Sequence, residues 1–271
     1  MPAVTPRELA QVIAELRGAG CVFAEDEAGL LVSAAGTAAE LGAMLRRRTA
    51  GTPLEQVLGW AEFCGLRIVV EPGVFVPRRR TEFLARQAAA LARQVSGVPV
   101  VLDLCCGSGA VAAALASMLG DLDDLELYAA ELDPAAVRCA RRNLAGVPVL
   151  QGDLYQALPA RLRGRLDVLV VNAPYVPSEA IAQLPPEARL HEPGLALDGG
   201  PDGLDVQRRV IEQAGHWLAP AGQLLIETSR QQSAELAATM TGAGLRGRVS
   251  SDAELGATVV IGQAGPAGDE R

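Results

Sequence analysis

The sequence contains few residues of the types that mark metal-binding, disulfide-rich or aromatic-cored proteins. Aromatic residues make up 3% of its 271 residues, so alanine, leucine and valine must build most of the core. Two histidines and five cysteines are present, and no two cysteines have the spacing of a metal-binding pair. We therefore expect no metal site, and we expect the cysteines to be reduced and used for packing.

Long apolar runs and an excess of basic charge are also missing. No uncharged segment reaches the length that crosses a membrane, and the polar start Thr5-Pro6-Arg7-Glu8 lacks the apolar stretch of a secretory signal. The formal net charge is −8, whereas a broad nucleic-acid surface usually has a basic stripe. These features predict a cytoplasmic protein without a membrane partner, and they argue against nucleic acid as the direct substrate.

The chain is long enough for one main domain and a smaller one. Two amphipathic patterns, near residues 5–18 and 37–48, predict a small N-terminal helical domain. A linker and a β-hairpin follow, and then seven predicted strands alternate with helices, which is typical of a mostly parallel sheet wrapped by helices. The last two strands are expected to form an antiparallel pair at the sheet edge. The predicted divisions are the helical domain, the linker with its hairpin, the main domain and a polar tail, at residues 1–50, 51–77, 78–262 and 263–271.

A buried-strand pattern at residues 98–104 runs into a glycine loop and then into an alanine-rich helix. This order brings backbone N–H groups close to a ligand at a helix N-terminus. Glu131 ends the next predicted strand, where a carboxylate can accept hydrogen bonds from both hydroxyls of a ribose. The pattern predicts a nucleoside site, although dinucleotide enzymes share it. The loop residues expected to bind the nucleoside are Asp103, Cys105, Cys106, Gly107, Ser108 and Gly109.

The apolar run at residues 166–171 is followed by the tetrapeptide Asn172-Ala173-Pro174-Tyr175. This places the tetrapeptide at the carboxyl end of a strand, where open α/β sheets bind ligands. Its amide oxygen, backbone carbonyls and aromatic face can hold a planar NH2 group, and Pro174 fixes the direction of the Ala173 carbonyl. An ordinary strand-ending turn has the same residue types, so the interpretation depends on the upstream loop.

Together these motifs resemble the S-adenosylmethionine-dependent amino-methyltransferases that use an Asn-Pro-Pro-Tyr motif. Further stretches narrow the resemblance to the protein N5-glutamine methyltransferases, which act on the Gly-Gly-Gln loop of peptide-chain release factors. The resemblance runs from about residue 50 to residue 262. The stretches that carry it are Gly51-Thr52-Pro53-Leu54, Leu58-Gly59, Glu62-Phe63, Gly65-Leu66, Pro77-Arg78-Arg79-Arg80-Thr81-Glu82, Glu192-Pro193, Ala196-Leu197, Gly199-Gly200 and Asp202-Gly203-Leu204.

The resemblance implies a Rossmann-like methyltransferase fold with S-adenosyl-L-methionine as the methyl donor. The donor is expected to lie over the glycine loop with its ribose on Glu131 and its methyl group directed toward Asn172. Asp153 is placed to accept from the adenine amino group, and Leu154 is placed to pack against the adenine ring.

The resemblance also implies the acceptor, which is a glutamine of a release factor or of another protein. The side-chain oxygen of Asn172 and the carbonyl of Ala173 are expected to hold the amide hydrogens, while Tyr175 covers the amide plane. Transfer then proceeds in line, without a covalent enzyme intermediate and without a strong general base.

Three positions depart from the family pattern. Cys105 stands where the family usually has Gly, and it fits there if its backbone φ is not positive. Ala173 replaces the usual Pro, which preserves the carbonyl acceptor and loses some rigidity. Arg80 replaces an acidic residue, which changes the charge at the mouth of the site.

Three alternatives stay open at this point. An exocyclic-amine methyltransferase acting on adenine N6 in RNA or DNA would use the same tetrapeptide. An NAD-dependent oxidoreductase would use the glycine loop and Glu131, but it leaves the tetrapeptide unexplained. A non-catalytic relative that binds the cofactor or a partner is compatible with the three departures.

Overall fold

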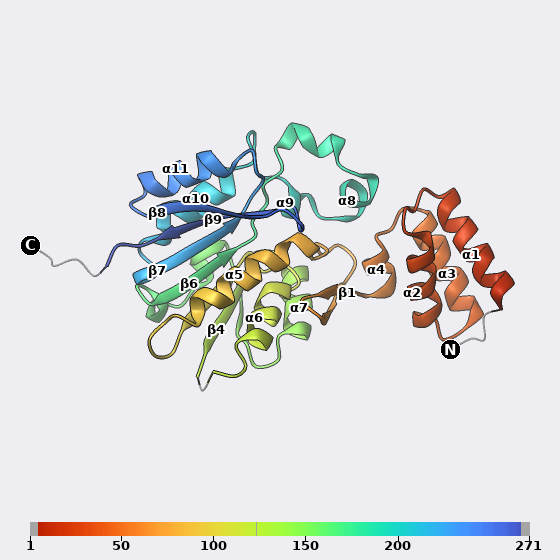
Figure 1. Cartoon of the computed structure of the whole chain (residues 1–271), viewed down its shortest axis with the longest axis horizontal. Coiled ribbons are helices and arrows are strands. Elements are labelled where there is room, and N and C mark those ends of the chain that lie inside the picture. The colour runs from red at the N-terminus through yellow and green to blue at the C-terminus, as the bar shows by residue number, and fades with distance from the viewer. Residues whose placement is uncertain (1–4, 123, 267–271) are drawn as a thin grey trace, which may run out of the picture.

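The computed structural model describes residues 5–122 and 124–266. It contains a seven-stranded sheet with helices on both faces, and a group of short helices lies to one side near the N-terminus (Figure 1). None of the helices in these ranges is long and apolar enough to cross a membrane.

The N-terminal helices pack around buried residues such as Leu16 and Leu31. They are α1 Pro6–Gly18, α2 Ala24–Ala34, α3 Ala38–Thr49 and α4 Leu54–Leu58. Thr5 and Thr37 begin α1 and α3 by accepting a hydrogen bond from the N–H of a glutamate three residues later. The sequence patterns do not predict α2, because Phe23 supplies no side-chain cap and alanines make up much of its buried face.

A β-hairpin joins these helices to the main sheet. Its strands are β1 Trp60–Phe63 and β2 Leu66–Val69, and both residues of the intervening turn, Cys64 and Gly65, have positive φ. Asn143 holds the hairpin by accepting from the Val69 N–H and donating to the Val69 carbonyl. The chain then enters a short 3₁₀ turn, η1 Arg79–Thr81, and helix α5 Glu82–Ala92.

The main sheet has the strand order β5-β4-β3-β6-β7-β9-β8, which confirms the Rossmann-like, mostly parallel fold. Strand β9 runs antiparallel to the other strands, and it pairs with β7 on one side and with the edge strand β8 on the other. The strands are β3 Val100–Leu104, β4 Glu126–Glu131, β5 Val149–Gln151, β6 Leu166–Val171, β7 Leu218–Glu227, β8 Arg246–Asp252 and β9 Ala257–Gln263.

Helices cover the two faces of the sheet with separate apolar cores. Helix α5 packs on one face with α6 Ala110–Met118 and α7 Pro134–Asn143. The other face is covered by α10 Asp205–Ala214 and α11 Ser233–Gly242.

Short turns and helices complete the connections between these elements. Between β5 and β6 the chain forms η2 Leu154–Ala157 and η3 Ala160–Leu162. Between β6 and α10 it forms η4 Ser178–Gln183, α8 Pro186–His191 and α9 Gly194–Leu197. The predicted division boundaries stay predictions, and residues 267–271 of the expected tail lie outside the described residues.

The order of the strands fixes where a site can form. From β3 the chain continues to β4 and β5 on one side, and then it returns to β6 and β7 on the other. Open α/β sheets bind ligands at such a reversal, outside the carboxyl ends of the strands. Leu104 and Val171 are register partners in β3 and β6, so Cys105 and Asn172 leave the sheet side by side.

Candidate active site

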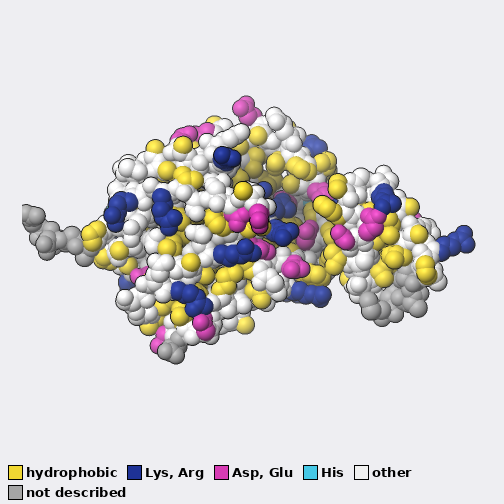
Figure 2. All heavy atoms as spheres, in the orientation of Figure 1, with side chains coloured by type: hydrophobic (Ala, Val, Ile, Leu, Met, Phe, Trp, Pro, Cys, Tyr) yellow, Lys and Arg dark blue, Asp and Glu magenta, His cyan; other side chains and the backbone are white. Residues whose placement is uncertain are grey.

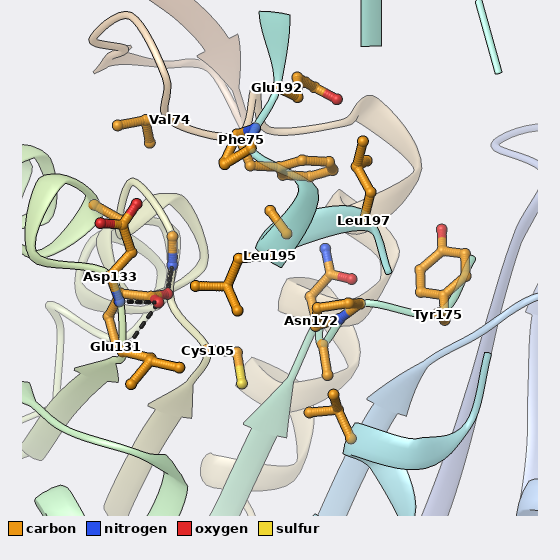
Figure 3. A pocket seen from close by; sticks show the side chains of 18 of the residues that line it. Val74, Phe75, Cys105, Glu131, Asp133, Asn172, Tyr175, Glu192, Leu195 and Leu197 are labelled. Carbon is orange, nitrogen blue, oxygen red and sulfur yellow. Dashed lines mark hydrogen bonds between the residues drawn. The ribbon is translucent and has the colours of Figure 1, made fainter. Parts of the chain in front are cut away.

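A cavity of about 490 Å³ opens at this reversal, within the range typical of small-molecule sites. Figure 3 shows Glu131 and Asp133 at one side of it, Asn172 and Tyr175 at the other, and Leu195 between them. The structure thus brings most of the predicted site residues together. Those that line the cavity are Cys105, Gly107, Glu131, Asp153, Leu154, Asn172, Ala173, Pro174 and Tyr175.

Four residues predicted to contact the nucleoside lie outside the cavity lining, namely Asp103, Cys106, Ser108 and Gly109. Cys106 and Ser108 are buried. Gly109 has φ +78° at the start of α6, and a Cβ there would lie 2.8 Å from Leu144 Cδ1. Asp103 Oδ2 accepts from the Ala112 N–H at 3.0 Å. These residues therefore shape the loop from behind the cavity wall.

Burial raises the pKa of Asp103 to about 7, so stability should depend on pH through this group. The folded protein then keeps a proton that the unfolded chain releases, and stability falls as pH rises from about 4 to about 7. Asp103→Asn removes this titration. As pH rises from about 4 to about 7, wild type should lose unfolding free energy that the variant keeps, as measured in denaturant titrations. A difference that is constant with pH would contradict the assignment.

The backbone at Cys105 differs from the expectation, because its φ is +62°. The sharp turn after β3 directs the Gly107 N–H toward Glu131, and a non-glycine residue in this conformation costs roughly 1–2 kcal/mol. Leu154, which lines the same cavity, also has a positive φ of +48°. Strained backbone of this kind clusters at functional sites, and it also occurs in turns such as that at Cys64. Burial raises the pKa of the Cys105 thiol, so it stays protonated.

The Glu131 carboxylate is held rigidly at the cavity wall. Its Oε2 accepts from the Gly107 N–H at 2.8 Å, and its Oε1 accepts from the N–H groups of Leu132 and Asp133 at 2.7 and 3.0 Å (Figure 3). A carboxylate offers about four acceptor positions, so these three donors leave room mainly on Oε2. Glu131 therefore has fewer free acceptor positions than the sequence predicts.

Asp153 also lies where the sequence places it, but its carboxylate has a protein partner. Arg209, on α10, donates from Nη2 to Asp153 Oδ2 at 2.6 Å and lines the cavity. The sequence gives no indication of Arg209, because an arginine on a helical face is ordinarily a solvated residue.

The tetrapeptide presents an oriented amide. Asn172 Nδ2 donates to the Thr81 hydroxyl at 3.4 Å, and Thr81 is buried. This assigns the amide nitrogen to the Thr81 side, and no described group donates to Oδ1. Asn172 therefore offers a free acceptor at the cavity wall.

Tyr175 is fixed at both ends. Its hydroxyl accepts from Arg80 Nη2 at 2.6 Å and donates to Glu227 Oε1 at 3.4 Å, while its backbone carbonyl accepts from Gln232 Nε2 at 3.0 Å. Burial raises the pKa of Tyr175 to about 12, so the hydroxyl stays protonated and cannot serve as a base at neutral pH.

Two stretches from the family resemblance meet above the cavity. The buried Glu192 accepts from the Val76 N–H at 3.1 Å and from Arg78 Nη2 at 2.6 Å, and the Arg78 guanidinium lies 4.8 Å from the centre of the Phe75 ring. Phe75 and Leu195 line the cavity. Sequence reasoning missed both, because a single apolar residue in a loop has no periodic pattern.

A buried arginine of the N-terminal helices contacts the cavity wall. Arg48 donates from Nε and Nη2 to the Glu27 carboxylate at 2.6 and 3.1 Å, and from Nη1 to Glu187 of α8 at 2.6 Å. Glu187 lines the cavity. The Arg48–Glu27 pair is buried, so losing either partner should destabilise the N-terminal helices, whereas Glu187 is half exposed.

Comparison with known proteins places the chain among methyltransferases. Residues 101–191 match the family model described as "Methyltransferase domain". The release factor glutamine methyltransferase of Bradyrhizobium diazoefficiens is 35% identical over 235 residues, covering 83% of this chain and 78% of that protein. The enzyme of the same name from Geobacter sulfurreducens is 38% identical over 188 residues, and the match covers 68% of this chain and 63% of that protein.

One relative carries a different name. The 4-amino-L-phenylalanine/4-methylamino-L-phenylalanine methyltransferase of Streptomyces pristinaespiralis is 38% identical over 213 residues, covering 76% of this chain and 71% of that protein. The Bradyrhizobium diazoefficiens match exceeds 30% identity and covers more than two thirds of that protein. The chain belongs to the release factor glutamine methyltransferase family.

Proposed function

We propose that this protein transfers the methyl group of S-adenosylmethionine to N5 of a glutamine in the Gly-Gly-Gln loop of a peptide-chain release factor. The observation that carries this proposal is the free Asn172 Oδ1, which lines the same cavity as the Glu131 carboxylate. A planar NH2 group bound at Asn172 would face the part of the cavity lined by Gly107, Glu131 and Leu154, which we call the donor half. Family membership supports the reaction class.

The donor half fits a sulfonium nucleoside in shape and charge. Gly107 leaves the loop open, Glu131 supplies a fixed acceptor for a ribose hydroxyl, and Leu154 offers an apolar surface for a base. Glu131 and Asp133 favour a ligand that carries positive charge. When bound, S-adenosylmethionine supplies the electrophilic methyl group.

The rest of the site, lined by Asn172, Ala173 and Tyr175, is the acceptor half, and it orients and shields the target nitrogen. Asn172 Oδ1 and the Ala173 carbonyl accept its hydrogens, and the Tyr175 ring covers the plane of the amide. Because the described geometry keeps Tyr175 protonated, these residues act by positioning and by excluding water rather than by removing a proton in advance.

The direct test is incubation of a release factor with S-adenosylmethionine and this protein, followed by mass spectrometry of tryptic peptides. We expect one added methyl group on the glutamine of the Gly-Gly-Gln peptide. RNA is offered in a parallel reaction with labelled donor, since adenine N6 is also a planar NH2. Label found only in RNA would overturn the proposal. On the face shown in Figure 2, basic and acidic side chains are interspersed, which favours the protein substrate.

A second candidate acceptor is a small aromatic amine. The Streptomyces pristinaespiralis relative, named for 4-amino-L-phenylalanine, is as similar to the chain as the Geobacter sulfurreducens enzyme is. The apolar residues Phe75, Leu195 and Leu197 also line the cavity, and they suit a phenyl ring. Offering 4-amino-L-phenylalanine beside the release factor separates the two candidates. Family membership gives no support to the NAD-dependent alternative.

Glu131 provides a test of the donor half by itself. Glu131→Ala should weaken S-adenosylmethionine binding by roughly 10- to 100-fold in calorimetry, because hydrogen bonds to a charged acceptor contribute more than neutral ones. Glu126→Ala is the matched control, since Glu126 lies at the opposite end of β4 and pairs with Arg165 at the surface. Equal affinities for wild type and Glu131→Ala would show that the nucleoside binds elsewhere.

A further inference from the structure

Glu227 is a buried carboxylate directly behind the tetrapeptide, and the proposed reaction assigns it no role. It ends β7 and is 1% exposed. Strands β6 and β7 are parallel, with Val171 opposite Ile226, so the next residues along them are Asn172 and Glu227. The carboxylate therefore lies at the same level of the sheet as the acceptor half of the cavity.

Glu227 forms a closed set of contacts with Tyr175 and Arg80. Its Oε1 accepts from the Tyr175 hydroxyl at 3.4 Å and from Arg80 Nε at 3.3 Å, while Arg80 Nη2 donates to the same hydroxyl at 2.6 Å. The hydroxyl thus donates to one charged group and accepts from the other. This pair of contacts fixes the rotation of the ring that covers the substrate amide.

Thr81 is a second buried residue beside the tetrapeptide. The Thr81 hydroxyl accepts from Asn172 Nδ2, which leaves its own proton to be donated. Burial raises the pKa of Glu227, and the neighbouring Thr81 hydroxyl and Arg80 guanidinium oppose that rise. Thr81 is 3% exposed, so its contact with Asn172 is shielded from water.

Strand stability alone gives no reason for a carboxylate here. Gln207 Nε2 already holds the end of β7 by donating to the Glu227 backbone carbonyl at 3.1 Å. Among the described residues, Glu227 Oε2 and Gln207 Oε1 are the buried side-chain polar atoms without a hydrogen-bond partner. A buried acceptor without a donor costs about 1–3 kcal/mol, which a purely apolar residue would avoid.

We infer that Glu227 is a positioning residue for methyl transfer, which orients the ring of Tyr175 through its hydroxyl. Glu227 does not line the cavity, and its effect reaches the reacting nitrogen through the Tyr175 side chain. The inference rests on the proposed transfer at Asn172. It extends that proposal by naming the group that holds the acceptor half in its working geometry.

The kinetic test compares Glu227→Gln with Glu212→Gln, a control at an exposed glutamate of α10. The first variant keeps the shape of the side chain and removes its charge. We expect kcat to fall on the order of 10- to 100-fold, with the Kd for S-adenosylmethionine unchanged, because misplaced reacting groups lose rate rather than donor affinity. The control should match wild type. A kcat within about twofold of wild type, or a parallel loss of donor binding, would overturn the inference.

A double-mutant cycle tests the route through Tyr175. If Glu227 acts by orienting this ring, Glu227→Gln should slow Tyr175→Phe much less than it slows wild type, because the hydroxyl that couples the two is already absent. Fully additive losses would contradict the inferred route.

A third measurement does not depend on turnover. In protein labelled with ¹³C at tyrosine Cζ, the Tyr175 resonance is identified by its loss in Tyr175→Phe. It should move in Glu227→Gln and stay in place in Glu212→Gln. An unmoved resonance overturns the positioning role whatever the acceptor is. Wild-type protein that methylates none of the offered acceptors would instead count against the proposed function, while the resonance still decides the role of Glu227.

Discussion

Asn172→Ala should lower the rate of methyl transfer by roughly 100-fold or more while leaving the affinity for S-adenosylmethionine within about twofold of wild type. The reason lies in the geometry of the amide. Thr81 holds Asn172 Nδ2, and this leaves Oδ1 as a free acceptor that fixes one hydrogen of the target NH2. Without that acceptor the delocalised nitrogen can rotate away from the line of transfer.

Single-turnover kinetics and calorimetry measure the two quantities separately. Gln213→Ala serves as the control, because Gln213 is exposed on α10 and does not line the cavity. A variant that methylates as fast as wild type would remove Asn172 from the acceptor half. A large loss of donor affinity would instead place its side chain on the donor side.

Gly203→Ala should be among the most damaging single-methyl changes in the protein. Gly203 has φ +80°, and a Cβ there would lie 2.3 Å from the backbone oxygen of Tyr175 and 2.5 Å from Gln232 Nε2. The backbone cannot yield without moving the tetrapeptide. We expect a loss of about 3 kcal/mol or more in the free energy of unfolding, because overpacking adds to backbone strain.

The control separates strain from clash. Gly146 has φ +79°, and a Cβ added there would meet no described atom within 4 Å, so Gly146→Ala should lose only about 1 kcal/mol. Denaturant titration of both variants, together with activity at a temperature where each is folded, gives the comparison. Equal losses at the two positions would mean that contact with Tyr175 has no cost of its own.

The sequence predicts the site best where a motif is local. The apolar run before Asn172 and the glycines after β3 mark strand ends, and parallel strands bring such ends to one edge of the sheet. Cys105 and Asn172 are far apart in the sequence, but this rule still predicts that they lie close together in the fold. The same reasoning locates Glu131, the last residue of β4, and Asp153, which lies just beyond β5.

Contacts between segments that are distant in the sequence have no local sequence motif that would predict them. Arg209 neutralises Asp153 across 56 residues, and Arg80 reaches Glu227 across 147. Both depend on the packing of helices and loops against the finished sheet. The positive φ of Cys105 is equally hidden, because side-chain identity disfavours that conformation and only the surrounding structure requires it.

Strand β8 also determines how the sheet ends. It pairs with β9 on one side, and its exposed Arg246 and Arg248 lie along the outermost strand of the sheet. An open strand edge is a template on which another chain can assemble, and positive charges placed along it oppose such growth by mutual repulsion. The arginines of β8 thus oppose the addition of a strand from another molecule at this edge of the sheet.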